Sequence, residues 1–139
     1  MQVMEKTEKE IEKDVYRIIK ASVLKDEIKG SFYRAGMRPK DAMSEDVVVK
    51  FHTGLDGQEQ SGIVLVHIYV PNIKVSVDGE LAEDITRIEH LENILNGVIN
   101  SMENDEYWLE KDGTPKSFPG EGIEQHFINA RIKYRRKSF

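Results

Sequence analysis

The spacing of apolar residues along the chain predicts two helices. Residues 11–24 carry apolar side chains close to helical spacing, and Thr7 and Glu10 are placed as a capping box at the start. Gly30 is the expected end of this first helix. Apolar residues recur at three- and four-residue steps over residues 80–102, which is the clearest helical pattern in the chain.

Four other stretches have the composition of β-strands. Residues 46–53 and 62–70 are rich in β-branched and aromatic side chains, and the glycines between them predict a hairpin. Because residues 62–70 are apolar on both faces, we expect this strand in the centre of the sheet. Residues 107–109 predict a short strand, and residues 127–135 alternate between apolar and polar side chains.

The order of these elements predicts the fold class. Residues 31–45 and the proline- and glycine-rich residues 114–122 are expected to be loops. A helix, two strands, a helix and further strands indicate an α+β fold, with an antiparallel sheet of about four strands and two main helices packed on it. We expect one domain over residues 1–139, with residues 1–10 and 136–139 frayed.

The composition limits the available chemistry. The chain has 139 residues and no cysteine, which excludes disulfides, thiolate catalysis and cysteine-ligated metals. No apolar stretch is long enough to span a bilayer, and the charged N-terminal region lacks the apolar centre of a signal peptide. We therefore expect the chain to stay in the cytoplasm unless it leaves inside a larger particle.

Charge is unevenly distributed along the chain. Residues 78–106 hold nine acidic residues and one basic residue, whereas residues 126–139 hold five basic residues and no acidic one. Arg131, Lys133 and Arg135 fall on one side of the alternating strand. Acidic and basic regions of neighbouring copies can meet head to tail. Two alternatives are that both regions are solvated or that they pair within one subunit.

No motif in the sequence indicates catalysis. The four histidines, His52, His67, His90 and His126, have no i, i+4 spacing and no HExxH motif. No phosphate-binding glycine pattern or GxSxG motif occurs. A hydrogen-bonded structural histidine is the simpler interpretation of His67, although convergence of His52, His67 or His126 in space stays open. We expect no catalytic residue, no cofactor and no metal.

Several segments, in this order, resemble a known family. They are the opening helix at residues 15–24, residues 33–39 leading into 44–49, strand 62–70 with Pro71-Asn72-Ile73, the helix at 81–102, and the closing segment 125–132. This arrangement resembles the small tail-terminator and head–tail joining (neck) proteins of tailed bacteriophages and prophages. The resemblance covers most of the chain after residue 10, and the charged residues 1–13 depart from the family pattern.

The resemblance implies a structural function. Members of this family form rings, often of six subunits, that cap the tail tube and join it to the head connector. No catalysis and no cofactor are implied. The implied partners are further copies of the chain and other tail or neck proteins, with DNA only as passing cargo and no membrane. The implied location is the host cytoplasm during assembly and then the virion.

If the chain belongs to such a ring, two sets of charged residues are candidates for its contacts. For the contact between subunits, the hypothesis pairs Arg131, Lys133 and Arg135 with Glu83, Glu89 and Glu92. The residues expected to face a lumen through which DNA passes are Arg34, Arg38 and Lys40. The loops at residues 54–62 and 111–122 are candidates for contacts with the tube or neck.

Three other functions remain as alternatives. A stand-alone ligand-binding or regulatory α+β domain would have a deep apolar pocket. A small enzyme would bring His52 and His67 next to a carboxylate in a cleft. Nucleic-acid binding through the basic strand is opposed by the net charge of −5 and by the lack of an RNP-like or helix-turn-helix pattern.

Overall fold

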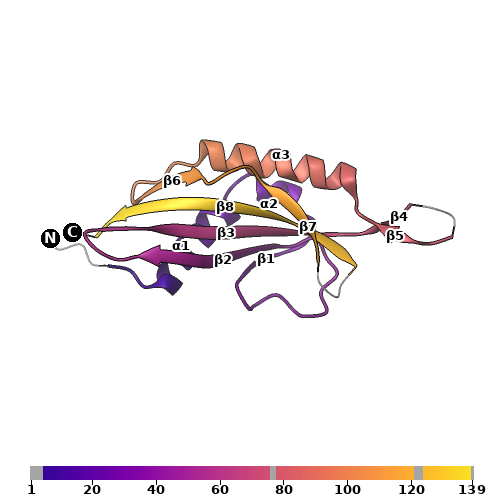
Figure 1. The fold of residues 1–139 in the computed structure, drawn as a ribbon, viewed down its shortest axis with the longest axis horizontal. Helices are drawn as coiled ribbons and strands as arrows, with labels where there is room; N and C mark the ends of the chain where they lie inside the picture. Colours follow the sequence, from indigo (N-terminus) through magenta and orange to yellow (C-terminus); the bar gives the residue numbers. More distant parts are fainter. Residues whose placement is uncertain (1–4, 76–77, 121–123, 139) are drawn as a thin grey trace.

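A computed structural model of the chain describes residues 5–75, 78–120 and 124–138. Within these residues, three helices pack on one side of a six-stranded sheet, and a two-stranded arm stands apart from that sheet (Figure 1). The elements are α1 (Glu8–Lys20), α2 (Leu24–Glu27), β1 (Phe32–Arg34), β2 (Val47–Leu55), β3 (Glu59–Pro71), β4 (Ile73–Lys74), β5 (Leu81–Ala82), α3 (Ile85–Ser101), β6 (Tyr107–Lys111), β7 (Lys116–Pro119) and β8 (Gln125–Lys137).

The central strand of the main sheet is β3, as predicted. The strand order is β1-β2-β3-β8-β6, and β7 also pairs with β8. β3 and β8 pair along their whole length, with Glu59 opposite Lys137 and Pro71 opposite Gln125. β6 and β7 therefore share the other edge of β8, one after the other.

The α+β class is confirmed, but the sheet is larger than the predicted four strands and is mixed. β1 runs parallel to β2, whereas the other neighbouring pairs of this sheet are antiparallel. Residues 31–45 and 114–122, both expected to be loops, contribute β1 and β7. Both are short strands at the edge of the sheet, where proline is tolerated because one side of the strand needs no backbone partner.

The start of α1 is as predicted, but its end is not. The amide of Glu10 donates to Thr7 Oγ1 at 3.3 Å, and the amide of Thr7 donates to Glu10 Oε1 at 3.1 Å, which is a capping box. The helix ends at Lys20 instead of near Gly30, and the separate short helix α2 follows.

The second predicted helix is also shorter than expected. α3 begins at Ile85 because the Asp84 side chain caps it, accepting a hydrogen bond from the amide of Arg87 at 3.2 Å. Leu81, which the pattern assigned to the helix, lies in β5 instead.

The chain is ordered further towards its ends than expected. β8 continues to Lys137, and the amide of Ser138 donates to the carbonyl of Gln58 at 2.8 Å. Near the other end, the amide of Lys6 donates to Gln60 Oε1 at 3.0 Å. Both end regions are thus held beside the β2–β3 turn. Residues 1–4 and 139 lie outside the described part of the chain.

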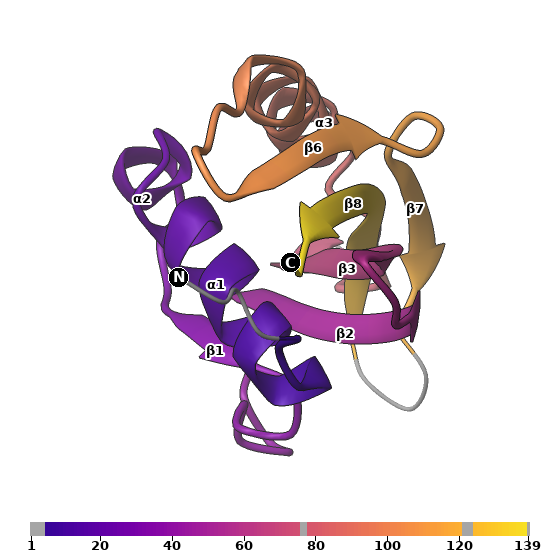
Figure 2. The same cartoon turned by 90° about the vertical axis from the view of Figure 1, so that its left-hand side faces the viewer.

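The core lies between the helices and one face of the sheet. Figure 2 shows α1, α2 and α3 along one side of the curved sheet, with β7 away from them. Alternate residues of β8 point into the core, as the sequence predicts. The main core side chains are Ile11, Val15 and Ile19 of α1, Ile88, Leu91 and Leu95 of α3, Val64, Val66 and Ile68 of β3, and Ile128, Ala130 and Ile132 of β8.

Buried carboxylates join the helices to the sheet. Glu12 of α1 accepts hydrogen bonds from Arg34 Nε of β1 at 3.1 Å and from the amide of Phe51 of β2 at 3.1 Å. Glu45, which precedes β2, binds Arg87 of α3 through two contacts of 2.9 and 2.7 Å. A paired carboxylate that accepts further hydrogen bonds avoids the cost of an isolated buried charge.

Asp46 is the most enclosed of these carboxylates. It is fully buried and accepts from the amide of Ser31 at 2.8 Å, from Ser44 Oγ at 2.7 Å and from Arg38 Nε at 2.9 Å. The backbone of Gly30 packs directly against it, so a Cβ at position 30 would collide with the carboxylate. Gly30 is therefore needed for this close approach and not to end a helix.

We expect the variant Asp46→Asn to lower the free energy of unfolding by about 3 kcal/mol, because it removes the anionic partner of the partly buried Arg38 at a fully buried position. Chemical denaturation of the variant and the wild type measures the difference. Asp41→Asn, an exposed position in the same segment, is the matched control and should have little effect. Equal stability of the two variants would contradict the assigned role of Asp46.

A second prediction concerns the stability of the fold at low pH. For Asp14, Asp46 and Glu106, burial alone would raise the pKa, but hydrogen bonds to cationic and polar neighbours outweigh it and hold each pKa below its ordinary value. Such groups stabilise the fold fully above their unfolded pKa, and this contribution is lost as the pH falls through the native pKa. The unfolding temperature should therefore be steady at neutral pH and fall below about pH 4. A melting temperature that rises on acidification would contradict this.

Candidate interaction surface

One face of the main sheet is not covered by the helices. Because residues alternate along a strand, the neighbours of the core residues in β3 and β8 point away from α1 and α3. We call this surface the open face. It is formed by Ile63, Leu65, His67 and Tyr69 of β3, Phe127, Asn129, Arg131, Lys133 and Arg135 of β8, and the adjoining Lys50, Trp108 and Phe118.

Aromatic rings pack together at one end of the open face. Tyr69, Phe127 and Phe118 lie side by side on β3, β8 and β7, with ring centroids 5.7 Å apart in each neighbouring pair. His67 adds a fourth ring, with its centroid 5.0 Å from that of Phe127. Neighbouring rings are tilted against each other by 33–43°, so they form a packed cluster more than a flat platform for further stacking.

Arg38 covers this aromatic end. Its guanidinium carbon lies 4.1 Å from the centroid of the Tyr69 ring, and its NH2 group donates to Gln125 Oε1 at 3.2 Å. Since Asp46 also binds this guanidinium, Arg38 links the segment before β2 to the open face. Arg38 therefore has a structural role that the sequence did not reveal.

The three residues expected to face DNA are in different environments. Arg34 is bound to Glu12 and to the carbonyl of Lys9, and Arg38 is bound to Asp46. Lys40 is exposed. Each of the two arginines is thus already neutralised by a carboxylate of the chain. The hypothesis that these residues face DNA stays a prediction. Of the three, Lys40 could contact DNA without first breaking an ion pair.

The other end of the open face is basic. Arg131, Lys133 and Arg135 project from alternate positions of β8, as predicted, and Lys133 lies opposite Ile63 of β3. Arg131 Nε contacts Asp112 Oδ2 at 3.0 Å, an exposed pair that contributes little. Lys133 is exposed and has no ion-pair partner among residues 5–75, 78–120 and 124–138.

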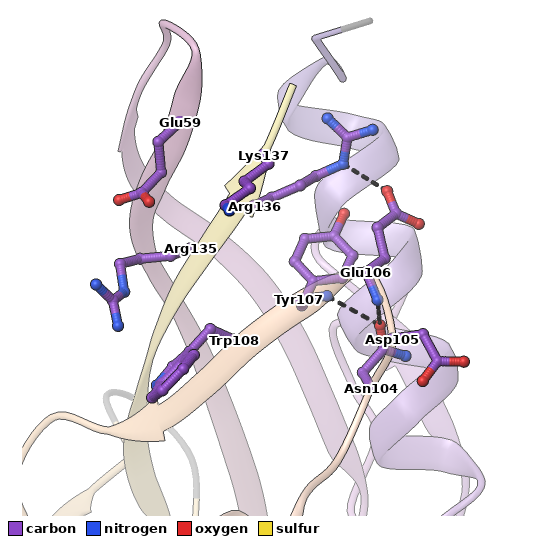
Figure 3. Close-up of a pocket in the computed structure, with 9 residues that line it drawn as sticks. All are labelled: Glu59, Asn104, Asp105, Glu106, Tyr107, Trp108, Arg135, Arg136 and Lys137. Atoms are coloured by element: carbon purple, nitrogen blue, oxygen red, sulfur yellow. Dashed lines mark hydrogen bonds and ion pairs between the residues drawn. The ribbon is translucent and has the colours of Figure 1, made fainter. Parts of the chain in front are cut away.

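Trp108 adds a large apolar side chain to this basic end. It is the single tryptophan of the chain and is 63% exposed. The guanidinium carbon of Arg135 lies 4.9 Å from the centroid of the Trp108 ring, a cation–π arrangement (Figure 3). The basic end of the open face therefore combines cations with exposed apolar surface.

An open hollow of about 730 Å³ borders Trp108 and Arg135 (Figure 3). On its other side lie Glu106 and Arg136, which bind each other, and Arg136 NH1 also contacts Gln60 Oε1 at 3.0 Å. The hollow opens widely to solvent, and two of its charged groups, Glu106 and Arg136, pair with each other. It differs from the deep apolar pocket that a ligand-binding domain requires.

The predicted acidic residues gather at the N-terminal half of α3. Burial raises the pKa of Glu92, and the nearby carboxylates of Glu83 and Glu89 raise it further. Glu83 Oε2 lies 3.5 Å from His126 Nε2. Within the described part of the chain, no lysine or arginine forms an ion pair with any of the three carboxylates. They repel one another and would gain from an external cation.

The six residues of the predicted subunit contact are not brought together within one chain. The basic side chains point away from the helices, and the carboxylates belong to α3 or the segment before it. In the residues that the structure describes, Arg131 pairs with Asp112 and not with any of the three glutamates. These six residues therefore do not pair with one another within the subunit, although Arg136 of the same basic region binds Glu106 of the acidic region. Contact of the six residues between subunits is compatible with the geometry.

The four histidines lie in separate environments in the described part of the chain. His52 is exposed on β2, and His67 lies among aromatic rings, where burial lowers its pKa. His126 Nδ1 contacts Asn72 Oδ1 at 2.8 Å. His90 Nε2 contacts Glu27 Oε2 at 3.0 Å on the surface. The same residues contain no cluster of three or more histidine or acidic side chains suited to a metal ion.

The two loops expected to contact a tube or neck are also largely structured. Gly54 and Leu55 belong to β2, and β3 begins at Glu59, which leaves a short turn in place of the predicted loop 54–62. Residues 116–119 form β7 within the predicted loop 111–122. Residues 121–122 of that loop lie outside the described residues.

Comparison with known proteins does not identify the chain. No protein-family model matches it, and no curated protein is significantly similar. No helix among the described residues is long and apolar enough to cross a membrane. The resemblance to phage tail and neck proteins therefore rests on the sequence segments alone.

Proposed function

We propose that the chain is a structural assembly protein of a phage or prophage tail or neck, which forms or joins a ring at the end of the tail tube. Its copies associate through the open face, and it performs no catalysis. The observation that carries the proposal is the presence of two surfaces of opposite charge on one chain. The open face presents cations and exposed apolar side chains, and α3 presents three carboxylates without a lysine or arginine partner in the described residues.

The composition of the open face supports a protein partner. Arginine and large aromatic residues are enriched at the centres of protein interfaces, and Trp108 and Arg135 provide this combination. The aromatic cluster at the other end is internally packed, which does not favour stacking of nucleic-acid bases. An acidic protein surface fits the open face better than a single-stranded nucleic acid does.

The location of the two surfaces supports head-to-tail association. A contact between two different surfaces of the same chain is heterologous, and repeated heterologous contacts generate a closed ring or an open filament. A ring is the arrangement that the family resemblance implies. The phage context itself is supported by the resemblance of the ordered segments and by nothing else in the molecule.

We expect the triple variant Arg131→Glu/Lys133→Glu/Arg135→Glu to associate at least about tenfold more weakly than the wild type, a loss of ~1.4 kcal/mol. Light scattering after size exclusion, at low and high salt, measures the mass. The charge-matched control is Lys20→Glu/Lys25→Glu/Lys29→Glu, which changes three exposed lysines outside the open face.

A charge swap completes the test. The variant Glu83→Lys/Glu89→Lys/Glu92→Lys should also lose association, and a chain that carries both triple changes should regain it. Undiminished assembly of the first triple variant, or failure of the swapped chain when each triple variant alone is defective, would refute this contact.

Trp108 should report association directly. Because this tryptophan is the only one and is largely exposed, its fluorescence emission should shift to the blue as the open face is covered at rising concentration. Quenching by acrylamide, a neutral quencher, should fall in parallel. If the mass increases while emission and quenching stay constant, the copies associate through another surface.

A further inference from the structure

A two-stranded arm projects from the end of the domain opposite the β2–β3 turn. β4 and β5 pair with each other, Ile73 opposite Ala82 and Lys74 opposite Leu81, and neither strand joins the main sheet. The arm extends along the long axis of the molecule, beyond the ends of β3 and β8 (Figure 1). Because so short a hairpin is marginally stable alone, a surface that covers it would stabilise it.

Large apolar side chains are exposed on the arm and beside it. Ile73 is 44% exposed, Val75 61%, Leu81 43% and Ile85 59%. Several exposed apolar residues within one short segment mark a candidate site of interaction. By the register of the arm, Ile73 and Leu81 project to opposite sides of it, so both sides carry apolar surface. The arm is therefore a candidate docking element.

The same region is acidic. Residues 73–92 hold six acidic residues, namely Asp78, Glu80, Glu83, Asp84, Glu89 and Glu92, against two basic residues, Lys74 and Arg87. Arg87 does not neutralise them, because its guanidinium is bound by Glu45 at 2.9 and 2.7 Å. We call the arm and the first turns of α3, which carry these apolar and acidic side chains, the arm surface.

We infer that the arm surface of one copy docks on the open face of the next copy. This inference rests on the proposed function and names the element that occupies the open face. The carboxylates Glu83, Glu89 and Glu92 pair with the basic end, and the apolar side chains of the arm cover Trp108, Ile63 and Leu65. Charge and apolar character are complementary on the two surfaces.

The arm cannot reach the basic end of its own open face. It leaves the sheet after Pro71, while Ile63 marks the basic end on the same strand. At about 3.3 Å per residue, these two positions of β3 are roughly 27 Å apart. The arm points away from the sheet along this direction (Figure 1). The contact therefore has to form between different copies.

A second apolar surface is a poorer partner for the arm. Ile18, Val23, Val98 and Met102 line an open groove of about 460 Å³ between α1 and α3. The charged residue that lines this groove is Glu103, which repels the acidic arm surface. The open face carries cations instead, and this difference favours it as the docking site.

The first test replaces apolar side chains of the arm without changing its charge. We expect Val75→Ser/Leu81→Ser to weaken self-association about tenfold at both low and high salt, because apolar contacts are not screened by ions. Val23→Ser is the matched control, since Val23 is 60% exposed but lies in the groove. Wild-type affinity of the arm variant, or an equal loss in the control, would overturn the inference.

The second test maps the contact. Since the chain has no cysteine, a Val75→Cys variant can be labelled at one position with a photo-reactive benzophenone. Irradiation of a mixture of isotopically light and heavy chains, followed by mass spectrometry, identifies cross-links between copies. We expect them at open-face residues of β3, β6 or β8. Cross-links to the groove, to a second arm, or to none of these would overturn the inference.

The two proposals can fail separately. A wild-type chain that stays monomeric at all accessible concentrations overturns both. A chain that assembles, responds to charge reversal on β8 and is insensitive to the arm variant overturns the arm inference alone.

Discussion

Carboxylates enclosed within the fold join the helices and the loop before β2 to the sheet. Asp46 and Glu45 are adjacent at the start of β2, yet they bind different arginines, Arg38 and Arg87. Through these bonds, the two residues that precede β2 hold the loop that contains Arg38 and the helix α3 that contains Arg87. Removal of either arginine would leave a buried carboxylate without its cation, which costs stability.

This constraint has a consequence for the opposite face. With α1, α2 and α3 all held on one side, β3 and β8 expose alternate residues that no helix covers (Figure 2). A central strand with apolar residues on both faces is usual where both faces are buried. In β3 the second set of apolar residues is only partly buried in the isolated chain. This pattern agrees with the proposal that another copy of the chain covers the open face.

Local sequence patterns predicted much of this fold. Where the structure differs from the prediction, contacts between residues distant in sequence explain most of the difference. The Thr7–Glu10 cap and the alternation in β8 depend on neighbouring residues, and both were predicted correctly. β1 was missed because it is three residues long and is held by Glu12, which lies 22 residues before Arg34. The basic row was assigned to the correct side of β8, whereas the roles of Arg34 and Arg38 depend on partners that no local pattern reveals.

The placement of the arm gives the molecule a direction. The arm lies at one end of β3, and the turn between β2 and β3, with both end regions of the chain, lies at the other (Figure 1). A row of copies joined head to tail would have two different ends, one that offers an unoccupied arm and one that offers an unoccupied sheet. The two ends of such a row would therefore bind different partners, and only closure into a ring would leave neither end free.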